Sequence, residues 1–268
     1  MVKISVLMAT KNGERTIESS IDSILSQSFT DFEFIIVNDN SSDKTEAIVN
    51  KISEIDDRIV LINNLEDPGL TSSLNIGLKR CQGEFVARMD DDDIASSGRI
   101  TTELEYLEEN SSVAIVGSNI NYFDNNGVYG KSDFKHSLSK VDIWRGIIFA
   151  NPTVMIRRSV FEKTGGYNES DDVIRVEDYD YWCKLYSKGF YGVNLDECLL
   201  NYREDKLAFK KRNNIRRWRL AKRMFFWRKR MNIPLYLLYV PLFELLKCLV
   251  PQNAIRMYHR IKYSDKSI

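Results

Sequence analysis

Apolar and polar residues alternate in blocks along the first part of the chain, and the blocks have two different periods. Apolar residues recur at helical spacing after residue 16, as at Ile17, Ile21 and Ile24, and similar stretches predict helices ending near residues 53 and 81. Short β-branched, apolar runs of the kind that form buried parallel strands occupy residues 3–10, 32–39, 58–64 and 83–90. This alternation predicts an α/β fold, a Rossmann-like open and mainly parallel sheet flanked by helices.

The rhythm loosens after residue 93, where helices and strands alternate less regularly. Further helices are predicted over residues 100–110, 160–165 and 178–188. Strands are predicted over residues 113–120 and 147–158 and near residues 191 and 199, with polar turns over 124–140. We therefore expect one domain over residues 1–202, with a nucleotide-binding half at 1–93 and an acceptor half at 94–202.

The remainder, residues 203–268, has a different composition and is expected to be a basic, amphipathic helical tail. It carries 18 Lys/Arg against 4 Asp/Glu, a net of +14, whereas the first 202 residues carry −14. Residues 233–250 are largely apolar, but two prolines, Glu244 and Lys247 interrupt them, and a spanning helix needs about 20 clean apolar residues. An interfacial helix on an anionic membrane surface fits this tail better.

The overall composition, 43% hydrophobic and 28% charged, is ordinary for a soluble globular protein. Nothing upstream of the basic tail resembles a nucleic-acid-binding module, so no nucleic-acid partner is expected. The four cysteines are widely spaced and the two histidines lie far apart, which argues against a zinc site and favours reduced thiols. No signal peptide is evident at the N-terminus. We expect a cytoplasmic protein that is peripheral at the inner face of the cell membrane.

Polar clusters follow three of the predicted strands, at residues 10–14, 38–40 and 90–93. In an open parallel sheet, ligands bind at the carboxyl ends of the strands, so these clusters mark the expected site. Neither GxGxxG nor GxxxxGK[ST] occurs, and a bound phosphate would need another means of neutralisation.

The run of four aspartates at residues 90–93 could provide it. Residues two apart in an extended chain point the same way, so Asp90 and Asp92 would form a pair suited to Mn²⁺ or Mg²⁺. Asp91 would then tolerate replacement by alanine. The alternative is an acidic surface turn that caps the next helix.

Two further acidic positions have both a structural and a chemical interpretation. Asp39 either caps the helix that follows it or accepts hydrogen bonds from a nucleotide base. Glu177 and Asp178 open an aromatic-rich helix, where the helix dipole favours acids. Alternatively, one of them is a general base that takes a proton from an acceptor hydroxyl.

These motifs, in this order, carry a family resemblance. The stretches SVLMATKNGERTIESSIDSILSQSFTDFEFIIVNDNSSDKT, GLTSSLNIGLKRCQGEFVARMDDDDIASSGRI and GGYNES followed by VEDYDYW resemble the family 2 inverting glycosyltransferases of GT-A fold, over about residues 4–202. The chain departs from the family pattern at Lys11, Asn38 and Leu74. NIRRW at residues 214–218 stands where processive members carry Q-x-x-R-W, and we interpret it as part of the basic stretch.

The resemblance implies a role for each motif residue. Asp178 is the expected catalytic base, and Asp90 and Asp92 form the DXD pair that holds diphosphate through the metal. The expected donor contacts are Ala9, Thr10, Asn12, Glu14, Asp39, Asn75 and Asp90. The expected supporting residues are Asp93, Glu177 and Arg99, and the expected acceptor contacts are Trp144 and Asn151.

The function expected from this resemblance is transfer of one sugar, with inversion, from a nucleotide-diphosphate sugar to an acceptor hydroxyl. The donor would be a UDP-sugar and the acceptor a glycan or lipid-linked glycan, as in bacterial-type surface polysaccharide synthesis. Two alternatives stay open. A sugar-nucleotidyltransferase needs a glycine-rich basic loop, and TKNGERT at residues 10–16 is poor in glycine. A non-catalytic nucleotide-sugar-binding protein would not need Asp178.

Overall fold

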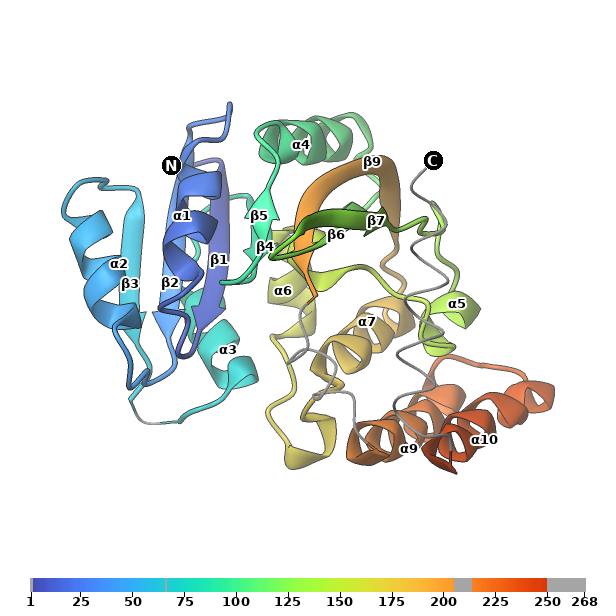
Figure 1. Cartoon of the computed structure of the whole chain (residues 1–268). Coiled ribbons are helices and arrows are strands. Elements are labelled where there is room, and N and C mark those ends of the chain that lie inside the picture. The colour runs from blue at the N-terminus through green and yellow to red at the C-terminus, as the bar shows by residue number, and fades with distance from the viewer. Residues whose placement is uncertain (1, 66, 205–213, 250–268) are drawn as a thin grey trace.

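A mixed sheet with helices on both faces forms the body of the protein in a computed structural model, which describes residues 2–65, 67–204 and 214–249 (Figure 1). The strand order is β3-β2-β1-β4-β8-β6-β9-β5, and β7 pairs with β6 at the side. The first four strands are parallel to one another, β8 runs against both neighbours, and β6 and β9 are parallel again. The predicted α/β class with a mainly parallel sheet is confirmed.

The elements between residues 4 and 89 follow the predicted strand–helix alternation closely. They are β1 (Ile4–Thr10), α1 (Ile17–Leu25), β2 (Phe32–Asn38), α2 (Thr45–Ser53), β3 (Ile59–Asn63), α3 (Leu70–Arg80) and β4 (Phe85–Met89). The parallel register places Thr10 beside Asn38 and Asn38 beside Asn63, so that the carboxyl ends of these strands form one edge.

The elements between residues 94 and 203 depart more from the predicted pattern. They are β5 (Ile94–Ala95), α4 (Arg99–Glu109), β6 (Ile115–Asp124), β7 (Gly127–Lys131), α5 (Lys140–Trp144), η1 (Asn151–Thr153), β8 (Met155–Arg157), α6 (Arg158–Thr164), η2 (Asp171–Val173), α7 (Glu177–Ser187) and β9 (Gly192–Arg203). The two short strands predicted near residues 191 and 199 are one strand, β9, and a strand, β7, lies where only turns were expected. Most of the predicted strand at 147–158 is not extended, because Pro152 lies in the 3-10 turn η1.

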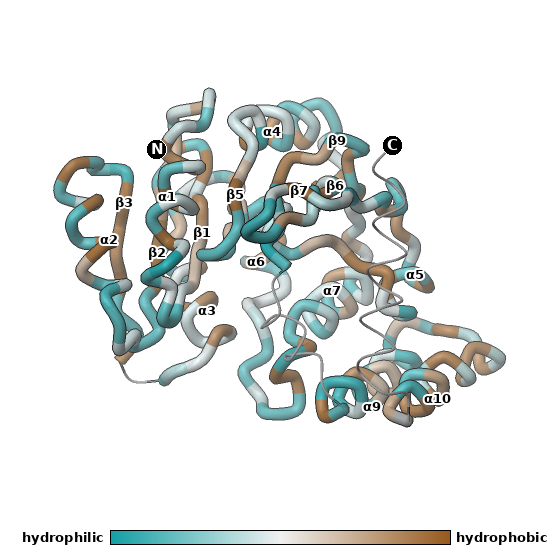
Figure 2. Tube along the Cα trace, viewed as in Figure 1, coloured by the Kyte–Doolittle hydropathy of each residue, from teal (hydrophilic) through white to brown (hydrophobic). Residues whose placement is uncertain are grey.

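Two hydrophobic clusters, one on each side of the sheet, form the core. Alternate residues of β1 face opposite sides: Ile4, Val6 and Met8 pack with α1, α2 and α4, whereas Leu7 packs with α3, α6 and α7. Strands buried on both faces need no polar alternation, which is why they are continuous apolar runs in the sequence. Figure 2 shows this apolar colouring along the central strands.

The first described helix of the basic tail packs into the cluster that contains Leu7. α9 (Asn214–Arg230) contributes Met224 and Trp227 to the cluster around α5 and α7, and the residues after it contribute Met231, Ile233 and Leu237. Within the described residues, the boundary expected at 203 therefore does not separate two cores. Residues 210–213 of the basic stretch and 250–268 of the tail lie outside the described residues.

The apolar stretch after α9 is broken into three short pieces, so the single amphipathic helix expected there is wrong. They are η3 (Leu235–Leu238), α10 (Tyr239–Leu246) and η4 (Lys247–Leu249). Pro234 precedes the first piece and Pro241 lies in the first turn of the second, positions where a missing N–H is tolerated. None of the helices in the described ranges has the length and apolarity that crossing a bilayer requires.

Candidate active site

A cleft of about 260 Å³ lies at the carboxyl ends of β1 and β2 and extends to the start of α7. It is lined by Ala9, Thr10, Lys11, Asp39, Leu70, Ile174, Arg175 and Glu177. The structure thus brings together residues from both halves of the chain. Three of the predicted donor contacts and one predicted supporting residue share this cleft.

Asp39 is a buried carboxylate that the surrounding loops hold firmly. Its Oδ1 accepts hydrogen bonds from the Gly69 N–H (2.8 Å), the Ser73 hydroxyl (3.2 Å) and the Asn64 amide (3.5 Å). Its Oδ2 pairs with Lys11 Nζ at 3.1 Å. The carboxylate therefore fixes the start of α3 while it lines the cleft. The expected helix cap on α2 is not its role.

Asn12 and Glu14 tie the loop after β1 to the loop that leads into α2. Asn12 Oδ1 accepts from the Ser42 N–H (2.9 Å), and Glu14 Oε2 accepts from the Lys44 N–H (3.1 Å). Neither residue lines the cleft. Both shape its edge, and their direct contact with a nucleotide stays a prediction.

The aspartate run forms a turn instead of continuing β4, so the expected two-residue alternation is wrong. The Asp90 carboxylate pairs with Arg88 at 2.7 Å and is 34% exposed. Asp91 does not point away from the site, because its Oδ2 accepts a 2.5 Å hydrogen bond from the Thr10 hydroxyl. Asp93 is fully buried and accepts from the Arg203 N–H at 2.8 Å. Burial and the charges of Asp90 and Asp92 raise the pKa of Asp93 well above its usual range.

Arg88, which the sequence analysis missed, holds Asp90 from inside the sheet. Its guanidinium is 2% exposed and donates to the carbonyls of Leu7 (3.1 Å) and Met89 (3.2 Å). The available signal was a lone arginine within an apolar strand, since a buried arginine requires an acidic or carbonyl partner.

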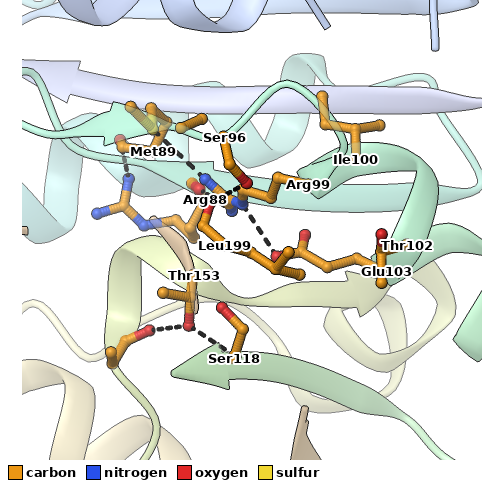
Figure 3. Close-up of polar contacts among 12 residues, drawn as sticks. Arg88, Met89, Ser96, Arg99, Ile100, Thr102, Glu103, Ser118, Thr153 and Leu199 are labelled. Atoms are coloured by element: carbon orange, nitrogen blue, oxygen red, sulfur yellow. Dashed lines mark hydrogen bonds and ion pairs between the residues drawn. The ribbon is translucent and has the colours of Figure 1, made fainter. Parts of the chain in front are cut away.

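Arg99 contacts the same strand, β4, through its side chain (Figure 3). It is fully buried, donates to the Arg88 carbonyl at 2.7 Å and pairs with Glu103 at 2.9 Å. Burial raises the pKa of Glu103 to about 7, although the charge of Arg99 opposes this. Arg99 therefore contacts β4, the strand that carries Arg88.

Glu177 and Asp178 are the first two residues of α7, and Glu177 lines the cleft. Both are half-buried, and Glu177 Oε2 and Asp178 Oδ1 have no hydrogen-bond partner in the described part of the chain. Burial, with the charge of Glu177 next, raises the pKa of Asp178 to about 7. The charges of Arg88 and Asp90 also act on Asp178, so the predicted base lies within electrostatic reach of the aspartate turn. A carboxylate with such a pKa can accept a proton near neutral pH.

Asn75, predicted as a donor contact, instead holds the loop at residues 166–169. Its side chain accepts from the Tyr167 N–H (2.7 Å) and donates to the Tyr167 carbonyl (3.0 Å) and to Glu169. The loop places Tyr167, a second residue missed from the sequence, near Asp178. The GGY motif was visible in the sequence, but no residue next to it in the sequence indicated that the Tyr167 hydroxyl lies near Asp178.

The two expected acceptor contacts have different outcomes. Trp144, the last residue of α5, is fully buried and donates to the Met224 carbonyl of α9 at 2.8 Å, so its prediction as an acceptor contact is corrected. Its size and apolarity place it in the core. Asn151 is partly buried, and its Oδ1 has no partner within the described residues, so its role stays a prediction.

Helix α9 holds the rim of the cleft through its basic side chains. Arg216 and Arg219 each donate, at 3.1 Å, to a carbonyl of the segment at residues 174–175, which lines the cleft. Arg223 pairs with the buried carboxylate of Asp180 on α7 at 2.5 Å. The charge of Arg216 acts on both Glu177 and Asp178. NIRRW is therefore part of the site's surroundings, and not merely of a basic stretch.

A divalent metal would have to rely on few protein ligands here. Across the described ranges, no three acidic, histidine or cysteine side chains converge on one point. Mg²⁺ is commonly held by one or two carboxylates together with substrate phosphates and water. The part-exposed Asp90 fits such a site as one carboxylate, and Asp92, two residues further along the turn, would be the second.

Comparisons with known proteins agree with this architecture. The profile of the family described as glycosyl transferase family 2 matches residues 5–165. EpsE of Bacillus subtilis (strain 168) is 33% identical over 96% of this chain and 93% of its own length. The O-antigen biosynthesis glycosyltransferase WbnJ of Escherichia coli is 34% identical over 75% of this chain and 79% of its own. The mannosyltransferase PcManGT of Pyrobaculum calidifontis, solved with GDP-Man and Mn²⁺, has a TM-score of 0.65 at 16% identity and covers 96% of this chain and 79% of that one.

Proposed function

Because the chain belongs to glycosyl transferase family 2, we propose that it transfers one sugar, with inversion, from a nucleotide-diphosphate sugar to an acceptor hydroxyl. The observation that carries this proposal is Asp178, a carboxylate with one oxygen that has no partner among the described residues and with a pKa raised to about 7. Its neighbour Glu177 lines the cleft, and the charge of Asp90 in the aspartate turn acts on Asp178. Such a group is suited to take a proton from an acceptor at neutral pH.

The donor's nucleotide lies in the cleft beside Ala9, Thr10 and Asp39, and the diphosphate lies toward Asp90. A uridine nucleotide is the carrier that the family resemblance favours. Asp90 and Asp92 would hold Mn²⁺ or Mg²⁺ together with the diphosphate. The metal, when bound, neutralises charge on the leaving group.

Asp178 acts on the acceptor from the opposite side of the sugar. It accepts the proton of the attacking hydroxyl while the oxygen of that hydroxyl bonds to the anomeric carbon and the diphosphate leaves. A single displacement of this kind inverts the configuration and needs one base. Glu177 and Arg216 adjust the proton affinity of Asp178, since the charge of Glu177 raises its pKa and that of Arg216 lowers it.

The acceptor is a glycan on a lipid carrier, as in the assembly of bacterial surface polysaccharides. Two observations support this part of the proposal. WbnJ, a relative, is an O-antigen biosynthesis glycosyltransferase. The described part of the tail also presents a largely apolar surface next to basic α9, made of Leu235, Tyr236, Tyr239, Leu242, Phe243 and Leu246, all more than half exposed. Such a surface beside basic residues fits an anionic membrane.

The central experiment measures sugar transfer. The full chain is incubated with labelled UDP- and GDP-hexoses, Mn²⁺ and a membrane extract, and incorporated label is counted. Asp178→Asn is expected to lose about 10²–10⁴-fold in rate while it keeps its affinity for the nucleotide sugar. Asp171→Asn, an exposed acid nearby, is the control and should transfer normally. Full activity in Asp178→Asn would refute the base. In a parallel incubation, formation of nucleotide sugar and pyrophosphate from sugar 1-phosphate and a nucleoside triphosphate would indicate a nucleotidyltransferase.

Membrane binding is tested separately by sedimentation with vesicles. The wild type should sediment with vesicles that contain phosphatidylglycerol and less with pure phosphatidylcholine. Leu242→Glu with Leu246→Glu should weaken sedimentation, whereas Ile55→Glu, also a change of an exposed apolar residue, should not. Equal binding by all three proteins would contradict the proposed surface.

A further inference from the structure

Several buried polar atoms around Asp178 have no partner in the described residues. They are Arg88 Nε, Tyr167 Oη, Glu177 Oε2 and Asp178 Oδ1. Native proteins leave few buried polar groups unpaired, because each costs free energy. Several at one site indicate that a polar ligand supplies the missing partners. Glu177 and Asp178 already have a place in the proposed chemistry, but the Tyr167 hydroxyl does not.

Tyr167 is held in one orientation by its backbone and its ring. The Asn75 amide binds both its N–H (2.7 Å) and its carbonyl (3.0 Å). Its ring packs on Tyr181, with centroids 4.5 Å apart. A Cβ on Gly166 would lie 2.0 Å from Asn75 Oδ1, so only glycine allows this approach. A phenylalanine could satisfy all of these contacts, and the hydroxyl adds nothing to them.

The buried hydroxyl lies near groups from both functional ends of the site. After burial, the strongest influences on it are the charges of Arg88, Asp178, Asp90 and Glu177. Asp90 marks the diphosphate end, and Asp178 marks the end where the acceptor is deprotonated. The ring of the transferred sugar must lie between these ends, since the bond that breaks faces one and the bond that forms faces the other.

We propose that the Tyr167 hydroxyl hydrogen-bonds a hydroxyl group of the transferred sugar and so selects donors that carry this group. The inference rests on the proposed function, because it assumes a nucleotide-sugar donor. Burial keeps the phenol protonated, so that it can donate this hydrogen bond. A site built around a buried polar partner discriminates strongly against analogues that lack the matching group.

The test replaces only the hydroxyl, with Tyr167→Phe. The donor is whichever UDP- or GDP-hexose the wild type uses best. We expect kcat/KM to fall about 10- to 100-fold, while affinity for the nucleoside diphosphate alone stays unchanged. With the monodeoxy analogue that lacks the contacted sugar hydroxyl, wild type and Tyr167→Phe should become equal. Tyr181→Phe is the matched control, because its hydroxyl lies 3.5 Å from Thr164 and belongs to the core.

The outcomes separate the inference from the function on which it rests. If the wild type neither binds nor transfers from any nucleotide sugar, the proposed function fails and the inference fails with it. If the wild type transfers sugar and Tyr167→Phe matches it on every donor, only the inference fails. Equal loss of affinity for the nucleoside diphosphate would also overturn it, because the hydroxyl would then act on the nucleotide or on the shape of the cleft. Thermal unfolding should show Tyr167→Phe to be at least as stable as the wild type, since the change removes an unpaired buried hydroxyl.

Discussion

In the loops that follow β1 and β2, polar side chains bond to the protein itself, whereas around the start of α7 several buried polar atoms have no partner in the described residues. Asp39 accepts three hydrogen bonds and an ion pair, and Asn12 and Glu14 each tie two loops together. Glu177, Asp178 and Tyr167 each keep a buried polar atom unpaired in the described part of the chain. We expect the first arrangement to give a rigid surface for a ligand, and the groups of the second to gain partners from a bound substrate.

Arg88 pairs with Asp90, and its charge also acts on Asp178. We therefore expect its removal to have the largest effect on both regions. Arg88→Met leaves Asp90 without its cation and takes away the charge that lowers the pKa of Asp178. We expect transfer to fall at least about 100-fold and the free energy of unfolding to fall by about 3 kcal/mol. Steady-state kinetics and urea unfolding measure the two effects. Arg157→Met, which removes an arginine bonded to carbonyls elsewhere, should lose stability but keep its kinetics. Normal transfer by Arg88→Met would show that the two regions act independently.

The pH dependence of transfer should be the next largest effect. The base works when ionised, so kcat should rise with pH up to about 7 and fall about tenfold per pH unit below it. The same raised pKa makes ionisation unfavourable in the folded state. The contribution of Asp178 to stability is therefore present below its unfolded pKa near 3.8 and is lost as pH rises through 7. Asp178→Asn should accordingly be more stable than the wild type at pH 8. A flat rate profile between pH 5.5 and 8 would contradict this assignment.

A smaller effect is expected from replacing Asp91, because this removes one hydrogen bond between the loop after β1 and the aspartate turn. Asp91→Ala removes the acceptor of the Thr10 hydroxyl, which links the β1 loop to the aspartate turn. We expect a loss of about 1 kcal/mol in stability and a severalfold rise in the donor KM. Thr10→Val should have a similar effect, and the double variant should lose less than the sum of both. Unchanged kinetics in Asp91→Ala would restore the expectation that this residue tolerates alanine.

The strands and helices of residues 3–90 could be predicted because their signal is local. A strand buried on both faces is a continuous apolar run, and a helix on one face of a sheet repeats its apolar residues every three or four positions. The same rules did not predict β7, the 3-10 turn within residues 147–154 or the division of residues 235–249 into three short helical pieces. There, pairing with a distant strand or the position of a proline outweighed the local pattern.

The sequence by itself determined the α/β class, the three polar strand ends and the acidic pair at the start of α7, together with the family to which the motifs belong. Only the tertiary structure decided that Asp91 binds Thr10, that Trp144 lies in the core and that α9 docks on α7 through Asp180 and Arg223. It also decided that the charges of Arg88 and Asp178 both act on the buried Tyr167 hydroxyl. The reason is physical: periodicity reports which face of an element is buried, whereas an unpaired atom or an ion pair depends on groups that meet only after the chain has folded.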